Sequence, residues 1–269
     1  MSKYSLGVDF EIIDFHTHPF LTNQYNISAY REEYHVSDED MIKDMDSFGI
    51  SRFCGAPIDR VNISRQNSLF PFSIIKETND KALELSEKYK DRYIPGFHIS
   101  PCFLEESLAE IERMADRGVK LVGELVPYLH AWREYNHEGI YPLLDEIEKR
   151  GMILNFHNMA QETIEDMVKS HPNIIFVAAH PGERGEVDRN VSLMKKYDNL
   201  YLDLSGTGIF RWPMLRYLVD SVGEDRILFG SDYPTCSPGV YIGGVLGEHI
   251  SDAAKEKIFS LNAKRLLGL

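Results

Sequence analysis

Two histidines stand two residues apart at the end of the first apolar run of the chain. They are His16 and His18, in the segment Asp-Phe-His-Thr-His-Pro. Successive side chains of a β-strand point to opposite faces, so a strand would place both imidazoles on one face. Neutral imidazole is a common metal ligand. The spacing therefore predicts a pair of metal ligands, although an HxH segment in a chain with ten histidines also fits a packed or surface pair.

Three further apolar runs end in a side chain that can bind a metal. They end in Asn-Phe-His157, Ala-Ala-His180 and Gly-Ser-Asp232. One such histidine is usually a hydrogen-bonded core residue, but several are hard to explain by packing because unpaired buried polar groups are costly. Imidazoles with one or two carboxylates suit zinc, manganese, iron or nickel better than calcium or magnesium. We therefore expect a divalent metal, with zinc as the first choice, as one or two ions.

Glu124 lies in another apolar run, Lys-Leu-Val-Gly-Glu-Leu-Val. A carboxylate at this position could bridge to a second metal, act as an acid or base, or hold a metal ligand in place. An ion pair with Lys120 or a nearby arginine is the alternative. The candidate metal ligands are therefore His16, His18, Glu124, His157, His180 and Asp232.

Asp232 and His180 are also the candidate catalytic residues. A metal with an open coordination position lowers the pKa of bound water towards neutrality and so supplies hydroxide. Asp232 could accept the proton of the attacking water and return it to the leaving group, while His180 stabilises negative charge or relays the proton. His98 ends a further apolar run, either as a support for a metal ligand or as a core histidine.

Short apolar runs alternate with helix-like stretches along the whole chain, which favours repeated β/α units around a parallel sheet. This pattern predicts a single-domain (β/α)8 TIM barrel over residues 1–269, with an open doubly wound sheet as the alternative. The predicted strands are Glu11–His18, Ser51–Pro57, Tyr93–Ile99, Val119–Val126, Met152–Asn158, Ile174–His180, Leu200–Leu204 and Ile227–Asp232.

The predicted helices lie between these strands, and several end at a glycine that is followed at once by a strand. Ser37 is the expected cap of the first helix. The predicted helices are Asp38–Phe48, Asn79–Tyr89, Glu105–Arg117, Tyr141–Arg150, Glu162–Ser170, Val187–Tyr197, Met214–Val222 and Asp252–Leu267.

Segments that leave the carboxyl ends of barrel strands surround the active-site mouth, so we expect substrate contacts there. The longest are Phe20–Val36 and Asp59–Phe72. The aromatic and basic run Tyr128–Arg133 and Trp212 are further candidates for the pocket wall. Arginines in or near such loops could bind a substrate carboxylate, and these are Arg60, Arg65, Arg184 and Arg211.

A formal charge of −13 and a pI near 5.2 disfavour non-specific binding to nucleic acids or anionic membranes. A small-molecule substrate is therefore the expected partner. The three cysteines form no CxxC pair, the amino-terminal segment is polar, and no apolar run is long enough for a membrane span. We expect a cytoplasmic protein with reduced, packed thiols. A homodimer is the expectation from the general prevalence of two-fold assemblies.

These motifs together resemble the amidohydrolase superfamily, in particular the amidohydrolase-2 branch that includes the aminocarboxymuconate semialdehyde decarboxylases. The resemblance runs from Asp14 to Leu266. It implies that the HxH pair, His157 and Asp232 hold the catalytic metal, and that His180 binds a second metal or acts beside the first. At Gly123-Glu124 the sequence departs from the carbamylated lysine of many binuclear members and is similar to TatD-type deoxyribonucleases.

The expected reaction is hydrolysis of an amide, ester or lactone bond in a small molecule. Non-oxidative decarboxylation of a small carboxylated substrate is the alternative, because the same metal could chelate the substrate. A TatD-like phosphodiesterase with two tightly bound metals is a third reading. The non-enzymatic alternative is a degenerate barrel that binds metal without catalysis, and the complete set of ligands argues against it.

Overall fold

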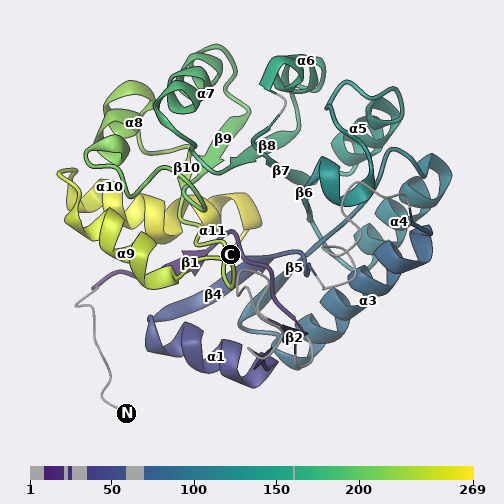
Figure 1. The fold of residues 1–269 in the computed structure, drawn as a ribbon, viewed down its shortest axis with the longest axis horizontal. Helices are drawn as coiled ribbons and strands as arrows, with labels where there is room; N and C mark the ends of the chain where they lie inside the picture. Colours follow the sequence, from purple (N-terminus) through teal and green to yellow (C-terminus); the bar gives the residue numbers. More distant parts are fainter. Residues whose placement is uncertain (1–8, 21–23, 26–34, 59–69, 160) are drawn as a thin grey trace.

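The computed structural model describes residues 9–20, 24–25, 35–58, 70–159 and 161–269 of the chain. Eight parallel strands form one sheet, and within this sheet the strands follow one another in sequence order (Figure 1). In spatial order they are β1 (Ile12–Asp14), β4 (Ile50–Gly55), β5 (Tyr93–Phe97), β6 (Leu121–Leu125), β7 (Ile153–His157), β8 (Ile175–Ala179), β9 (Leu200–Asp203) and β10 (Ile227–Leu228).

The sheet closes on itself between its first and last strands. The Phe15 N–H donates to the Phe229 carbonyl with an N···O distance of 2.9 Å, and Thr17 forms a parallel bridge with Tyr233. The His18 N–H donates to the Tyr233 carbonyl at 2.7 Å, so the contact continues beyond the strand ends. The closed ring confirms the predicted (β/α)8 TIM barrel and excludes the open doubly wound sheet.

Helices surround the barrel on the outside (Figure 1). They are α1 (Asp38–Ser47), α3 (Phe72–Lys88), α4 (Leu104–Asp116), α5 (Ile140–Lys149), α6 (Gln161–Ser170), α7 (Arg184–Lys196), α8 (Met214–Val222), α9 (Pro238–Gly247), α10 (Asp252–Glu256) and α11 (Asn262–Leu267). Shorter elements are the 3-10 turn η1 (Pro127–His130), the π-helical turn η2 (Lys257–Leu261) and the antiparallel pair β2 (Gln24–Tyr25) and β3 (His35–Val36).

The strand alternation separates two hydrophobic clusters, because neighbouring residues point to opposite faces. Ile12 belongs to the larger cluster, which also contains buried side chains of the outer helices. Ile13 belongs to a smaller cluster with Leu121 and Val177 from other strands and with Leu267 of α11. The strands are therefore buried on both faces, which leaves their carboxyl ends as the accessible part of the barrel.

Most predicted helices are confirmed, the last one as α10, η2 and α11 in succession, and the largest differences concern α3 and α9. Ser37 caps α1 as expected, because its Oγ accepts the Asp40 N–H at 3.1 Å. The helix α3 begins at Phe72, seven residues before the prediction, directly after Pro71. The helix α9 was not predicted, since its sequence Pro-Gly-Val-Tyr-Ile-Gly-Gly-Val-Leu-Gly is poor in strong helix formers. Burial of Tyr241, Ile242 and Val245 stabilises it instead.

Several predicted strands end earlier than the apolar runs do. The last strand stops at Leu228 rather than at Asp232, and β8 stops at Ala179 rather than at His180. His180 and Asp232 have φ values of 66° and 63°. These left-handed conformations cannot continue a strand, and they are uncommon in non-glycine residues and enriched at functional sites.

Candidate metal centre

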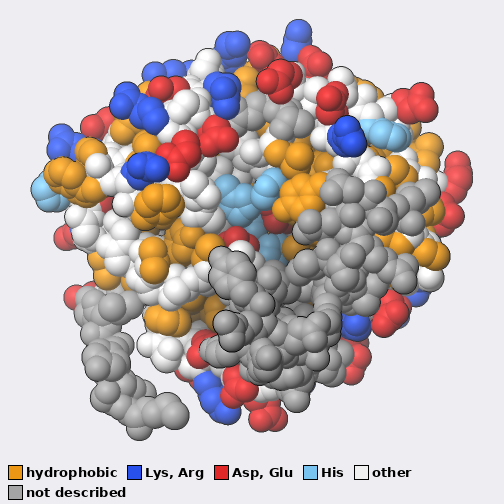
Figure 2. Space-filling view, viewed as in Figure 1, with side chains coloured by type: hydrophobic (Ala, Val, Ile, Leu, Met, Phe, Trp, Pro, Cys, Tyr) orange, Lys and Arg blue, Asp and Glu red, His pale blue; other side chains and the backbone are white. Residues whose placement is uncertain are grey.

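All six predicted site residues lie at the carboxyl ends of the barrel strands. In the space-filling view, histidine surface is visible at the centre of this face, next to carboxylate oxygen and bordered by apolar side chains (Figure 2). Two sets of side chains offer ligand atoms within 4.8 Å of one another. The first set is His16, His18 and Glu124, and the second is Glu124, His157 and His180.

The histidine pair just beyond β1 presents two ring nitrogens to the same point. His16 Nε2 and His18 Nε2 are 3.3 Å apart, and the rings are almost perpendicular. The other nitrogen of each ring faces a hydrogen-bond acceptor: His18 Nδ1 lies 3.1 Å from the Ala56 carbonyl, and His16 Nδ1 lies 2.9 Å from Asp203 Oδ2. With the protons on Nδ1, both Nε2 atoms are free to bind a cation.

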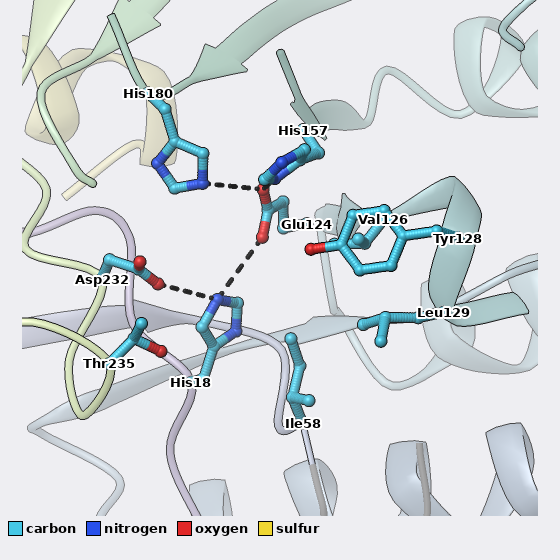
Figure 3. A pocket seen from close by; sticks show the side chains of 10 residues that line it. All are labelled: His18, Ile58, Glu124, Val126, Tyr128, Leu129, His157, His180, Asp232 and Thr235. Carbon is cyan, nitrogen blue, oxygen red and sulfur yellow. Dashed lines mark hydrogen bonds and ion pairs between the residues drawn. The ribbon is translucent and has the colours of Figure 1, made fainter. Parts of the chain in front are cut away.

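Glu124 lies between the two sets, as Figure 3 shows. Its Oε2 is 3.5 Å from His16 Nε2 and 3.4 Å from His18 Nε2. Its Oε1 is 2.7 Å from His157 Nδ1 and 3.4 Å from His180 Nε2. One carboxylate thus faces four imidazoles through two different oxygens, so Glu124 could contribute a ligand to either set of imidazoles.

Asp232 adds a carboxylate to the first set from the segment after β10, which lies next to β1 in the closed barrel. Its Oδ1 lies 3.2 Å from His18 Nε2 and 3.8 Å from His16 Nε2. The buried Asp14 anchors the segment that carries it, because the Asp14 carboxylate accepts the Ser231 N–H at 2.9 Å and the Ser231 O–H at 2.5 Å. Burial raises the pKa of Asp14 to about 7, although these hydrogen bonds act in the opposite direction.

Asp203 and Ser205, which are not among the predicted site residues, contact the outer nitrogens of His16 and His180. Asp203 is fully buried at the end of β9 and receives Asn155 Nδ2 at 3.1 Å as well as His16 Nδ1. Ser205 Oγ lies 3.0 Å from His180 Nδ1 and also donates to Asp203 Oδ1. Asp203 could have been identified from the sequence, because it is a carboxylate near the end of the seventh predicted strand. The same kind of position identified the histidines on neighbouring strands.

The electrostatics of the site favour positive charge. Burial alone would lower the pKa of the His16 imidazole, but the carboxylates of Asp203 and Glu124 outweigh it and hold that pKa well above its usual value. At His18, Asp232 and Glu124 outweigh burial in the same way and raise its pKa to about 9. Burial would raise the pKa of Glu124, yet the imidazoles of His157 and His16 keep it well below its usual range. A divalent cation supplies the positive charge that these carboxylates otherwise obtain from protons, so the donor set fits a metal.

A cavity of about 170 Å³ opens above these ligands (Figure 3). Its polar side is formed by His18, Glu124, His157, His180, Asp232 and Thr235, and its apolar side by Ile58, Val126, Tyr128 and Leu129. A wider cavity shares Tyr128, His157, His180 and Asp232 with it and extends to Phe210 and Tyr241. The predicted pocket-lining run after the fourth barrel strand therefore contributes Tyr128 and Leu129, whereas His130 and Trp132 are buried.

Other predicted candidates lie away from the cavity. His98 is fully buried, and its Nε2 lies 2.8 Å from the Pro57 carbonyl, so it is a core histidine. Arg184 and Arg211 are exposed and form ion pairs with Asp188 and Glu183. Trp212 is 68% exposed and packs on His249 rather than on the site. Arg60, Arg65, residues 21–23 and 26–34 and the segment 59–69 lie outside the described residues.

Comparison with known proteins places the sequence in a family. The profile of the amidohydrolase family, Amidohydro_2, matches residues 13–269. The chain therefore belongs to this family, which confirms the resemblance seen in the motifs. None of the curated proteins compared with the sequence matches it.

Solved structures with the same fold include an uncharacterized TIM-barrel protein from Bordetella bronchiseptica, at 21% identity and a TM-score of 0.76 over 96% of this chain and 98% of that one. A 2,6-dihydroxybenzoate decarboxylase from Rhizobium is 17% identical, with a TM-score of 0.76 over 96% and 99%. A 5-carboxyvanillate decarboxylase from Novosphingobium aromaticivorans, complexed with manganese and 4-hydroxy-3-methoxy-5-nitrobenzoic acid, is 15% identical, with a TM-score of 0.71 over 100% of both chains. At these identities the likeness shows a shared fold.

Among the described residues, none of the helices combines the length and the apolar character that a membrane span requires.

Proposed function

We propose that this protein is an enzyme that uses a divalent metal to hydrolyse an amide, ester or lactone bond in a small molecule. The observation that carries the proposal is the convergence of four imidazoles on Glu124, with Asp232 facing the same cavity. This constellation combines metal ligands with a carboxylate that can move a proton, and both are needed to activate water.

The residues that would hold the ion are His16, His18 and Glu124, with His157 and His180 around the other oxygen of Glu124 for a second ion. When bound, a divalent ion polarises a substrate oxygen and lowers the pKa of water. Zinc is our first choice from the ligand chemistry. Manganese is the alternative, since the 5-carboxyvanillate decarboxylase with this fold contains it.

Asp232 is the proposed proton acceptor. Its Oδ1 faces His18 Nε2 and its side chain lines the cavity beside Thr235 (Figure 3). A carboxylate in this position can take the proton of a water molecule that attacks the substrate and later return it to the leaving group. General acid–base help of this kind contributes about 10²- to 10⁴-fold to a rate.

Tyr128 is the proposed hydrogen-bond donor to the substrate. Its hydroxyl points into the cavity towards Glu124 (Figure 3), and its ring packs edge-on against His157. Burial raises the pKa of Tyr128 to about 12, so the hydroxyl stays protonated and can donate at neutral pH. A donor aimed at the position of a developing oxyanion favours acyl transfer.

The charges of the cavity favour an uncharged substrate over a carboxylate. Among the described residues that line the two cavities there is no lysine or arginine, and the charged ones, Glu124, Glu186 and Asp232, are acidic. Recognition of a substrate carboxylate would depend on the metal or on Arg60 and Arg65, outside the described residues.

Non-oxidative decarboxylation is the second candidate. Two of the proteins with this fold are decarboxylases of hydroxylated aromatic acids. The aromatic and apolar side chains of Tyr128, Leu129 and Phe210 on the cavity walls would suit an aromatic ring. In that reaction Asp232 or His180 would protonate the ring carbon that loses CO2.

The test is a substrate panel with two separate readouts on protein of known metal content. The panel contains uncharged amides, esters and lactones together with hydroxylated benzoates, and the readouts are formation of a new carboxylate, followed by chromatography and mass spectrometry, and CO2 release. We expect new carboxylate without CO2 on one of the uncharged compounds, and its loss in Asp232→Asn but not in Asp220→Asn, an exposed carboxylate paired with Arg216. CO2 release from a benzoate with no hydrolysis in the panel would replace this proposal by the second candidate.

A further inference from the structure

A buried chain of side chains connects two imidazoles on opposite sides of the candidate metal centre. His16 Nδ1 lies 2.9 Å from Asp203 Oδ2, and Ser205 Oγ contacts Asp203 Oδ1 closely. The same Ser205 Oγ lies 3.0 Å from His180 Nδ1. Asp203 and Ser205 are both fully buried, so water does not compete for these contacts.

In this series of buried side chains, the donor and the acceptor of each hydrogen bond can be identified. Both oxygens of Asp203 accept N–H groups, Oδ2 from Asn155 Nδ2 at 3.1 Å and Oδ1 from the Ser205 backbone at 3.0 Å, so Asp203 acts as a carboxylate without a proton of its own. The close contact between Ser205 Oγ and Asp203 Oδ1 requires a proton between two oxygens, and only the Ser205 hydroxyl can supply it. The remaining lone pairs of Ser205 Oγ must then accept the N–H of His180 Nδ1. His180 Nε2 is left without that proton and faces Glu124 Oε1 at 3.4 Å.

The backbone at Gly206 lies close to the His180 ring. Gly206 has a φ of +59°, and a Cβ added there would lie 2.3 Å from His180 Nδ1. Tyr241 donates its hydroxyl to the Gly206 carbonyl at 2.5 Å and so fixes the glycine against the ring. Asn155 holds the other end of the chain, because its Nδ2 donates both to Asp203 Oδ2 at 3.1 Å and to the Val177 carbonyl at 3.0 Å.

We propose that Asp203 and Ser205 are positioning residues that fix His180 with its proton on Nδ1 and an unprotonated Nε2 facing the cavity, as Asp203 does directly for His16. His180 then acts as a ligand or a proton acceptor, not as a neutral Nε2–H donor to developing negative charge. The assignment deepens the proposed function, since it chooses between two roles of His180, which are to stabilise negative charge or to relay a proton. The position of the proton on Nδ1 depends only on the buried side chains and not on the reaction.

The first experiment reads the position of the proton. Protein with ¹⁵N-labelled histidine is loaded with Zn²⁺ and long-range ¹H–¹⁵N spectra are recorded, with His180 assigned by its loss in His180→Gln. We expect Nδ1 to carry a proton and Nε2 to carry none. A bare Nδ1 with the proton on Nε2 would overturn the proposal, whether the protein is metal-loaded or metal-free.

The second experiment measures Zn²⁺ affinity by competition with a chelating dye, together with kcat and KM on the substrate found in the panel. Loss of an outer hydrogen-bond partner of a ligand typically weakens metal binding by about 10- to 100-fold. We expect a weakening of this size in Asp203→Asn and Ser205→Ala, with kcat falling more than KM rises, and recovery in Ser205→Thr, which keeps a hydroxyl. Ser260→Ala removes another buried serine hydroxyl, in η2, and serves as the control that should leave affinity unchanged.

Unchanged Zn²⁺ affinity and unchanged His180 signals in Ser205→Ala would refute the positioning role. If Asp203→Asn does not fold, the pair Ser205→Ala and Ser205→Thr decides the question. A protein that binds Zn²⁺, shows the expected His180 tautomer and hydrolyses nothing would instead refute the proposed function and keep this inference.

Discussion

Two groups of buried histidines lie at the same end of the barrel, and they differ in the charges around them. In the candidate metal centre, His16 and His18 face the carboxylates of Glu124 and Asp232. Outside it, His98 follows β5 and His130 lies in η1, with ring centroids 5.3 Å apart. The ring of Phe70 packs at 5.8 Å from His130, and both ring nitrogens of His130 are buried without a hydrogen-bond partner among the described residues.

Burial acts in the same direction on both groups, yet the outcomes are opposite. It lowers the pKa of His130 well below its usual value, and the neighbouring His98 adds to this effect. In His16 and His180 the carboxylates outweigh burial and raise the pKa. The carboxylates around a buried imidazole therefore decide whether its surroundings favour positive charge. Among the described residues, the ring contacts of His130 are with Phe70 and His98, neither of which is a carboxylate, and this fits a packing role.

The largest expected effect comes from removing a carboxylate from the first group. Asp232→Asn keeps the size of the side chain but cannot accept a proton, so turnover should fall by about 10²- to 10⁴-fold. Steady-state rates and metal content are measured on the same sample, because His16, His18 and Glu124 should retain the ion. A near-normal rate at normal metal content would remove Asp232 from the mechanism.

Metal removal should have the next largest effect. It distinguishes the two groups of histidines, because only the first group would be stabilised by a bound ion. An ion that binds only the folded protein stabilises it by about 2.7 kcal/mol when the free metal is 100 times its dissociation constant. For a chain of this length we therefore expect chelation to lower the midpoint of thermal unfolding by about 5–10 °C, and added Zn²⁺ or Mn²⁺ to restore it. A midpoint that does not change with metal concentration would argue against a centre at Glu124.

The glycine beside His180 sharpens the comparison, because it tests how closely the site is packed. Gly206→Ala forces a Cβ to 2.3 Å from His180 Nδ1 and meets a positive φ as well. Gly223→Ala has the positive φ of 75° but no atom within 4 Å of the added Cβ. We expect Gly223→Ala to cost about 1–3 kcal/mol from the positive-φ backbone alone.

In Gly206→Ala, overpacking adds about 1–3 kcal/mol to that backbone cost. Metal affinity should also fall, because the added methyl displaces the His180 ring. Urea unfolding and Zn²⁺ titration of the two variants measure both effects. Equal behaviour of the two variants would mean that the His180 ring has room to move.

The sequence could predict the barrel and the ligand set because both depend on local rules. Strand alternation placed His16 and His18 on one face, and the apolar runs before His157, His180 and Asp232 located three strand ends. In a parallel barrel all these ends meet at one face, so the convergence of the side chains followed from the fold.

What the sequence could not predict depends on contacts between distant segments. Asp203 was visible as a carboxylate at a strand end, but its partners His16 and Ser205 become evident only when the barrel closes. The helix α9 contains four glycines, and burial rather than propensity stabilises it. His98 and His180 both follow apolar strands, and only the surrounding carboxylates separate a core residue from a site residue.

The smallest expected effect concerns the second group and is a change in the pH dependence of stability. His130 has a lowered pKa in the folded protein, whereas in the unfolded chain its pKa returns to its usual value near 6.5. As the pH falls below that value, the unfolded chain binds a proton that the folded protein refuses, so His130 makes the protein less stable towards acid. In His130→Phe this contribution is absent, and the free energy of unfolding should decrease less between pH 7.5 and pH 5.5 than in the parent protein. Urea unfolding at a series of pH values measures the difference, and parallel curves for the two proteins would mean that His130 finds a partner for its proton in the folded state.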